Sequence, residues 1–204
     1  MPTAQTPPQT PPPPPPASTR AIIALIYTDS AAAADFLRVA ARGMEAAGLR
    51  LTGLLQREAP AAERAGCDMA LDELWSGETI VISQSRGAHA RGCKLVVGEL
   101  LRAAEIVSAS LSERPDCLIL NKFGKTEAEG GGFRPLIAKA VEQEIPILVA
   151  VPYRNLDAWR AFVGDLAQEI HLDRLDPQLG SIFDARIADR DAHIERITAL
   201  WSAL

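Results

Sequence analysis

Short apolar runs alternate with longer amphipathic segments along most of the chain. Residues 21–27 (AIIALIY) and 145–152 (IPILVAVP) are continuous aliphatic runs, typical of strands that are buried on both faces of a parallel sheet. Residues 49–58 (LRLTGLLQRE) and 117–120 (CLIL) predict two further strands. The sequence therefore predicts a sheet that is built largely of parallel strands.

Helical patterns separate these apolar runs. Residues 29–48 begin with a capping residue, Asp29 or Ser30, continue through alanines and end at Gly48, which suits a helix terminus. Residues 97–113 place apolar side chains at helical spacing. Three further helices are expected at residues 133–143, at residues 155–167 with Asn155 as the cap, and at residues 184–204.

Residues 67–84 interrupt this alternation. They predict a β-hairpin, because two apolar arms flank a polar turn that contains Ser76 and Gly77. Strands separated by helices favour an α/β fold. The predicted architecture is a three-layer α/β/α sandwich with a mostly parallel sheet and a β-hairpin insertion.

Three segments are expected along the chain. Residues 1–20 carry most of the 15 prolines and no aliphatic run, which is typical of a disordered tail. Residues 21–166 form the α/β domain, and residues 167–204 form a C-terminal extension that ends in an amphipathic helix. That helix either docks onto the domain or forms a homodimer contact, and the pattern leaves both open.

Composition narrows the functional classes. The chain has 204 residues, 48% of them apolar, which favours one domain with a sizeable core. Its formal net charge of -5 argues against a sequence-independent nucleic-acid binder. No stretch reaches the roughly 18 apolar residues that span a membrane, and no secretory signal is recognisable, so a cytoplasmic location is expected. The three cysteines and three histidines lack metal-ligand spacing, so no metal site is expected.

Ligands of such sheets bind outside the carboxyl ends of the strands. After the first strand the sequence YTDSAAAADF has neither glycine nor lysine, and Asp29 would compete with a phosphate for the N–H groups at the start of the next helix. After the strand at 117–120 come Asn121 and Lys122, which cannot supply the carboxylates of a magnesium site. A guanine-reading NKxD motif would need aspartate where Gly124 stands. A metal-bound nucleotide is therefore not expected.

The segment after residue 120 instead offers hydrogen-bond donors and positive charge. Lys122, Lys125 and Arg134 are cationic, Asn121 brings an amide, and Gly124 with the glycines at 130–132 lets backbone N–H groups turn toward a ligand. Such a set favours an oxyanion. Glu127 would act as a base or pair with a lysine. Solvated charges on an ordinary loop are the alternative interpretation.

A second basic segment covers residues 84–94 (QSRGAHARGCK) and contains no acid. Cations beside a cysteine stabilise its thiolate, although a single cysteine is more often inert. The candidate ligand-binding residues of the two segments are Gln84, Arg86, Cys93, Lys94, Asn121, Lys122, Gly124, Lys125, Glu127 and Arg134. No catalytic residue is assigned.

Three strings carry a resemblance to a known family: GCDMALDELWSGETIVISQSRGAHARGCKL, LNKFGKTEAEGGGFR and IPILVAV. Over residues 21–164 the chain resembles a bacterial family designated domain of unknown function twenty-four seventy-eight. Its members are often encoded near molybdate-uptake genes. The layout also resembles the small P-loop nucleoside-triphosphatases related to the human cancer-related NTPase, which implies a P-loop NTPase-like fold. The phosphate loop and the paired acids of those enzymes are replaced here, so the motifs are degenerate.

Three functions follow as hypotheses. The first is a non-hydrolysing accessory protein that binds a small anion or phosphate ligand, with an oxyanion such as molybdate implied by the family's neighbours. The second is an enzyme, either a nucleoside-triphosphatase variant or one in which Lys122 or Lys125 performs chemistry. The third is a protein-interaction module that uses the proline-rich tail and the final helix. The missing phosphate-loop lysine and the missing acids favour the first.

Overall fold

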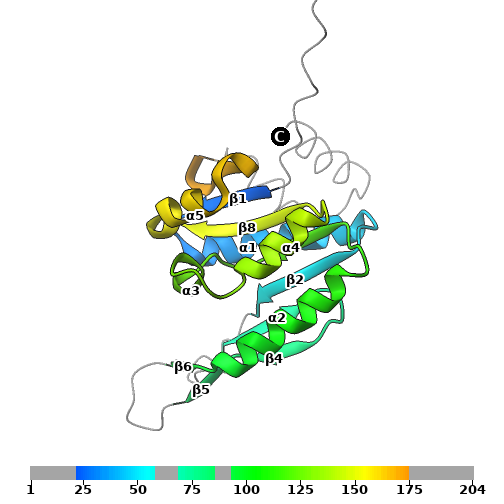
Figure 1. Cartoon of the computed structure of the whole chain (residues 1–204). Helices are drawn as coiled ribbons and strands as arrows, with labels where there is room; N and C mark the ends of the chain where they lie inside the picture. The colour runs from blue at the N-terminus through cyan, green and yellow to red at the C-terminus, as the bar shows by residue number, and fades with distance from the viewer. Residues whose placement is uncertain (1–21, 58–68, 86–92, 175–204) are drawn as a thin grey trace, which may run out of the picture.

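The alternation of apolar runs and amphipathic segments produces one seven-stranded sheet. The computed structural model describes residues 22–57, 69–85 and 93–174. The strands are ordered β4-β3-β2-β7-β8-β1-β9 (Figure 1). Their bounds are Ile22–Tyr27 (β1), Leu51–Gln56 (β2), Ala70–Glu73 (β3), Thr79–Val81 (β4), Cys117–Leu120 (β7), Ile147–Pro152 (β8) and Ala167–His171 (β9). Along the series β2-β7-β8-β1-β9, each strand pairs in parallel with its neighbours. Strand β3 pairs antiparallel with both β2 and β4. The predicted mostly parallel sheet is therefore confirmed.

Helices cover both faces of the sheet. The helices are α1 (Ser30–Ala46), α2 (Val97–Leu111), α3 (Lys125–Ala128), α4 (Arg134–Glu142) and α5 (Leu156–Val163). Helix α1 packs on one face, and α2, α4 and α5 pack on the other (Figure 1). The predicted three-layer α/β/α sandwich is confirmed.

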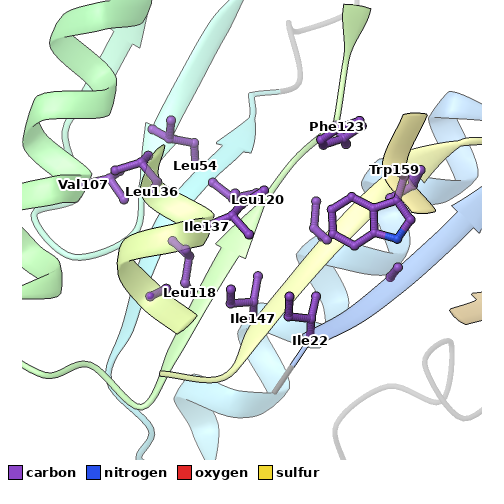
Figure 2. Close-up of a cluster of buried hydrophobic side chains, with 14 of the residues drawn as sticks. Ile22, Leu54, Val107, Leu118, Leu120, Phe123, Leu136, Ile137, Ile147 and Trp159 are labelled. Carbon is purple, nitrogen blue, oxygen red and sulfur yellow. The ribbon is translucent and has the colours of Figure 1, made fainter. Parts of the chain in front are cut away.

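The core therefore consists of two apolar clusters, one on each side of the sheet. In β1, Ile22 and Ile26 face α4 and α5, while Ile23 and Leu25 face α1. Figure 2 shows the larger cluster, in which strand residues such as Leu118 meet the three covering helices. Burial on both faces explains why the strand sequences are continuously apolar rather than alternating.

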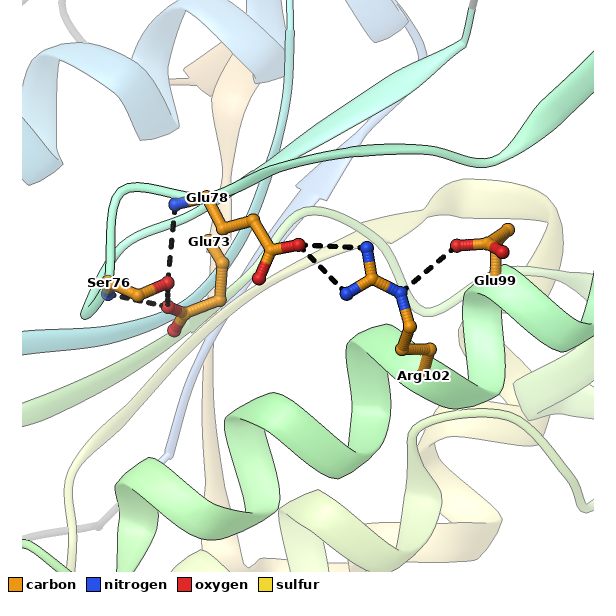
Figure 3. Close-up of polar contacts among 5 residues, drawn as sticks. All are labelled: Glu73, Ser76, Glu78, Glu99 and Arg102. Carbon is orange, nitrogen blue, oxygen red and sulfur yellow. Dashed lines mark hydrogen bonds and ion pairs between the residues drawn. The ribbon is translucent and has the colours of Figure 1, made fainter.

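The predicted hairpin is present as β3 and β4, with Ser76 and Gly77 in its turn. The Glu73 carboxylate is 1% exposed and accepts hydrogen bonds from the backbone N–H and the hydroxyl of Ser76, each at 2.7 Å. From α2, the Arg102 guanidinium donates to Glu78 at 2.8 Å and to Glu99 at 3.2 Å (Figure 3). The turn is thus closed by a buried carboxylate and tied to α2 by an exposed arginine.

Asn155 directly precedes α5, as predicted, but its side chain has another partner. Its side chain makes no capping hydrogen bond to α5, and its backbone angles of -106° and 6° are not those of an extended capping residue. Its Nδ2 instead donates to the carbonyl oxygen of Phe123 at 2.9 Å. Asn155 therefore occupies the N-cap position of α5 as predicted, but its side chain does not cap the helix, and its amide nitrogen donates to a carbonyl on a neighbouring loop instead.

Two further features were not predicted from the sequence. The sheet continues beyond residue 166, since β9 pairs in parallel with β1. A second hairpin pairs β5 (Ser83–Ser85) with β6 (Cys93–Leu95) where a basic loop was expected. The proline-rich tail at 1–20, Arg86 and the helix predicted at 184–204 lie outside the described residues. Within the described part of the chain, no helix is long and apolar enough to cross a membrane.

Candidate functional site

The loop that follows β7 is held between its neighbouring strands. The backbone N–H of Asn121 donates to Leu54 of β2 at 2.9 Å, and the N–H of Phe123 donates to Ala150 of β8 at 2.8 Å. The Phe123 carbonyl accepts from Asn155, at the start of α5. Both sides of the loop are therefore fixed before any ligand binds.

Phe123 anchors the same loop in the core. Its side chain is fully buried and lies 5.1 Å from the Trp159 ring in an edge-to-face arrangement and 5.9 Å from the Phe162 ring in a stacked one. Aromatic pairs of this geometry add to the stability gained by burial. The residue before it, Lys122, is consequently presented from a fixed backbone position at the carboxyl end of β7.

Lys122 and Arg154 form the centre of the candidate site. Burial and the positive charge of Arg154 lower the pKa of the Lys122 ammonium, while Glu127 acts in the opposite direction. Among residues 22–57, 69–85 and 93–174, no carboxylate forms an ion pair with either cation. Two unpaired positive charges thus lie within electrostatic range of each other, which is an arrangement that an anion would stabilise.

Arg154 was missed by the sequence analysis, although a signal was available. It follows Pro152, the last residue of β8, by two positions, and β8 lies between β7 and β1 in the sheet. The rule that ligands bind at the carboxyl ends of parallel strands would have selected it. The glycine-rich segment after β7 carries positive charge at a higher density in sequence, and the predicted site was therefore centred on it.

The start of α1 is closed by its own capping residue. Asp29 Oδ1 accepts hydrogen bonds from the N–H groups of Ala31 at 2.8 Å and Ala32 at 3.3 Å. These are N–H groups that a phosphate at a helix N-terminus would use. The expected competition between Asp29 and a phosphate is therefore built into the structure.

Glu127 is placed inside the loop rather than at its surface. Its carboxylate is 5% exposed, and it accepts from the backbone N–H of Gly124 at 2.8 Å and of Phe133 at 3.0 Å. Gly132 has a φ of +61°, and a Cβ there would lie 1.9 Å from Glu127 Oε1. The absence of a side chain at Gly132 thus leaves room for the Glu127 carboxylate, which joins Gly124 to Phe133 across the loop.

Lys125 and Arg134 have other partners. The Lys125 ammonium is exposed and lies 3.6 Å from the Glu129 carboxylate. The Arg134 guanidinium lies over the Phe162 ring, 4.0 Å from its centroid. Both cations belong to the same loop region as Lys122, but each makes a contact that does not involve the Lys122–Arg154 pair.

The described part of the second basic segment belongs to a separate two-stranded sheet. Gln84 pairs with Lys94 in the β5–β6 hairpin, and Cys93 pairs with Ser85. This hairpin follows β4, the edge strand that β3 and β2 separate from β7. The described residues therefore bring Asn121, Lys122 and Arg154 together at neighbouring strand ends, and they place Gln84, Cys93 and Lys94 beyond the opposite edge strand.

Metal and thiol chemistry find little support within the described ranges. They contain no group of three or more histidine, cysteine or acidic side chains that could hold a metal ion. Cys117 is buried in β7, and burial raises the pKa of its thiol to about 12. A thiol with so high a pKa is a poor nucleophile at neutral pH.

Comparison with known proteins agrees with the fold. Residues 22–177 match the family described as "Protein of unknown function (DUF2478)". The crystal structure of THEP1 from the hyperthermophile Aquifex aeolicus superposes with a TM-score of 0.50 at 15% identity, covering 79% of this chain and 95% of that one. This likeness confirms the predicted P-loop NTPase-like fold.

A longer protein contains a related segment. Over 143 residues, 69% of this chain, the sequence is 34% identical to the molybdenum import ATP-binding protein ModC 2 of Bradyrhizobium diazoefficiens. The chain spans 15% of the length of that protein.

Proposed function

This chain belongs to the DUF2478 family of proteins of unknown function, and we propose that it binds a small oxyanion or phosphate-bearing ligand without hydrolysing nucleoside triphosphates. Its role would be that of an accessory protein in molybdate uptake or homeostasis. The observation that carries the proposal is the unpaired Lys122–Arg154 pair at the carboxyl ends of β7 and β8.

The chemistry of binding is charge-assisted hydrogen bonding. The Lys122 ammonium supplies a compact charge with three donors, and the Arg154 guanidinium supplies a planar fork that matches two oxygens of an oxyanion. The half-buried Asn121 amide adds a neutral donor from the same loop. A bound dianion would offset the repulsion between the two cations and raise the lowered pKa of Lys122.

The absence of hydrolysis is inferred from residue types at the strand ends. A P-loop enzyme cradles phosphates with glycine N–H groups and a lysine after its first strand, and holds magnesium with an acid. Here Asp29 takes the N–H groups at the start of α1. Asn121 and Lys122 follow β7 in place of acids. These residues favour a ligand that arrives without a metal ion.

Molybdate is proposed as the anion because of the related segment in a longer protein. That relative is named as a molybdenum import ATP-binding protein, and the related segment is part of the same polypeptide. Domains that occur in one polypeptide commonly serve one process. Molybdate is a tetrahedral dianion, so it matches the charge of the Lys122–Arg154 pair.

Isothermal titration calorimetry with the full chain tests this proposal. The ligands are molybdate, tungstate, sulfate, phosphate and ATP, the last with and without magnesium. Lys122→Ala and Arg154→Ala are each expected to weaken oxyanion binding by about tenfold or more, as expected for loss of one charge-assisted contact. Lys125→Ala is the matched control, because this lysine is exposed and contacts Glu129 instead. Magnesium-dependent ATP binding with turnover, or equal losses for all three variants, would contradict the proposal.

A second candidate function is supported by the lowered pKa of Lys122. A lysine with a depressed pKa has a larger neutral fraction and attacks carbonyl groups more readily. Under this alternative, Lys122 forms a Schiff base with a small carbonyl substrate. Incubation with pyruvate and sodium borohydride, followed by peptide mass spectrometry, would place a covalent adduct on Lys122 and not on Lys125.

A further inference from the structure

A groove opens beside the cation pair, at the carboxyl ends of β1, β8 and β9. Its volume is about 560 Å³, and Tyr27, Thr28, Tyr153, Arg160, His171 and Arg174 contribute to its lining. These residues come from the ends of β1 and β9, the 3-10 turn Tyr153–Asn155, helix α5 and the turn Leu172–Arg174. The groove is therefore framed by three neighbouring strand ends rather than by a single loop.

The groove and the cation pair are adjacent through two residues. Tyr153 lines the groove and directly precedes Arg154 in the turn that follows β8. Tyr27 lies in the groove lining, close enough to Arg154 for the guanidinium to act on its hydroxyl group. Arg154 is thus within electrostatic range of both Lys122 and the groove-lining Tyr27.

The size and lining of the groove fit more than a bare ion. Pockets of roughly 300–1,000 Å³ accommodate organic ligands of drug-like size. Tyr153 is 60% exposed, which is high for a large aromatic side chain at the end of a buried strand. The hydroxyl of Thr28 and the ring of His171 add polar groups to the lining that could orient heteroatoms.

We infer that the anionic group of the ligand is carried on a planar organic ring, which lies in this groove against Tyr153 while Arg154 and Lys122 hold the anion. The inference rests on the proposed function, which it extends from a bare oxyanion to an organic phosphate or similarly charged ring compound. Stacking on an exposed tyrosine tolerates many types of ring. This geometry therefore indicates the class of ligand, a ring compound that carries an anion, and does not specify which ring it is.

Matched phosphates test the inference on the full chain by calorimetry. The probes are inorganic phosphate, propyl phosphate and phenyl phosphate, which differ in the group attached to the anion. Phenyl phosphate is expected to bind about tenfold more tightly than the other two, because stacking on an aromatic side chain contributes on that scale. In Tyr153→Ala this ratio should fall to about one, and Tyr153→Phe should retain it.

The outcomes separate the two proposals. If the inorganic anions bind through Arg154 but phenyl phosphate gains nothing over propyl phosphate, the ring site is refuted and the anion site stands. If phenol binds as well as phenyl phosphate, and Arg154→Ala changes neither, the groove binds rings but the anion site is refuted. A gain for phenyl phosphate that survives Tyr153→Ala would overturn the placement of the ring.

Discussion

Replacing Glu127 by glutamine is expected to destabilise the protein by about 2 kcal/mol, because the substitution removes one of two acceptors that hold the loop after β7. The carboxylate accepts from the N–H of Gly124 at 2.8 Å and from the N–H of Phe133 at 3.0 Å. A glutamine side chain of the same shape has a single acceptor oxygen. One N–H would then face an amide NH₂ group with no acceptor within the loop.

The magnitude follows from burial. Glu127 is 5% exposed, so water cannot readily replace the lost acceptor. Leaving a buried N–H unpaired costs about 1–3 kcal/mol, and a hydrogen bond to a charged acceptor contributes about 1.5–3 kcal/mol. Glu127→Gln should therefore cost about 2 kcal/mol. Glu127→Ala, which removes both acceptors and leaves a cavity, should cost about 4 kcal/mol.

Urea denaturation followed by tryptophan fluorescence and far-UV circular dichroism measures these differences in the free energy of unfolding. Glu129→Gln is the matched control. This glutamate lies two residues away, is exposed, and pairs with Lys125 at 3.6 Å, so its replacement should cost less than about 0.5 kcal/mol. If Glu127→Gln lies within about 0.5 kcal/mol of the wild type at equal m, the buried carboxylate does not hold the loop and the reasoning fails.

Three further predictions concern other positions. Gly53→Ala should cost about 3 kcal/mol or more in the same assay, because φ is +122° and a Cβ would lie 1.9 Å from the Ile119 carbonyl oxygen, whereas Gly98→Ala, with no atom within 4 Å, should not destabilise. The lowered pKa of Lys122 means that the unfolded state binds its proton more tightly. The contribution of Lys122 to stability should consequently rise with pH between the lowered pKa and the ordinary value of 10.5, and the stability of the wild type relative to Lys122→Met should rise by the same amount in urea titrations. Cys117 should resist thiol labelling in the folded protein and react after unfolding, as peptide mass spectrometry would show.

The strands that carry apolar runs or flank a recognisable turn were predictable from sequence, whereas β9, β5 and β6 were not. Continuous apolar runs identified β1 and β8 to within two residues, because both of their faces meet helices. Strand β9 (AQEIH) is only half-buried along its length and pairs with β1 at the edge of the sheet. It carries no apolar run, so no periodicity signals it. The three-residue strands β5 and β6 are too short to show a pattern at all.

The residues of the candidate site were predictable only where their role depends on a neighbouring segment of the sequence. Lys122 was selected because it follows a predicted strand directly. The amide of Asn155 and its carbonyl partner on Phe123 are 32 residues apart, so their contact depends on the order of β7 and β8 in the sheet. The position of Glu127 was also not predictable, because its partners are backbone N–H groups, which every sequence supplies. Sequence motifs report side-chain types, while these contacts depend on where the backbone turns.

The cap that Asp29 supplies to α1 separates folding from ligand binding in this protein. In a site where phosphate satisfies the helix N-terminus, the first turn is completed by the ligand, and part of the binding free energy orders the protein. Here the carboxylate of Asp29 completes that turn within the chain itself. The empty and the occupied protein should therefore have the same helix content, and a ligand should raise the unfolding midpoint only as far as its concentration and affinity dictate.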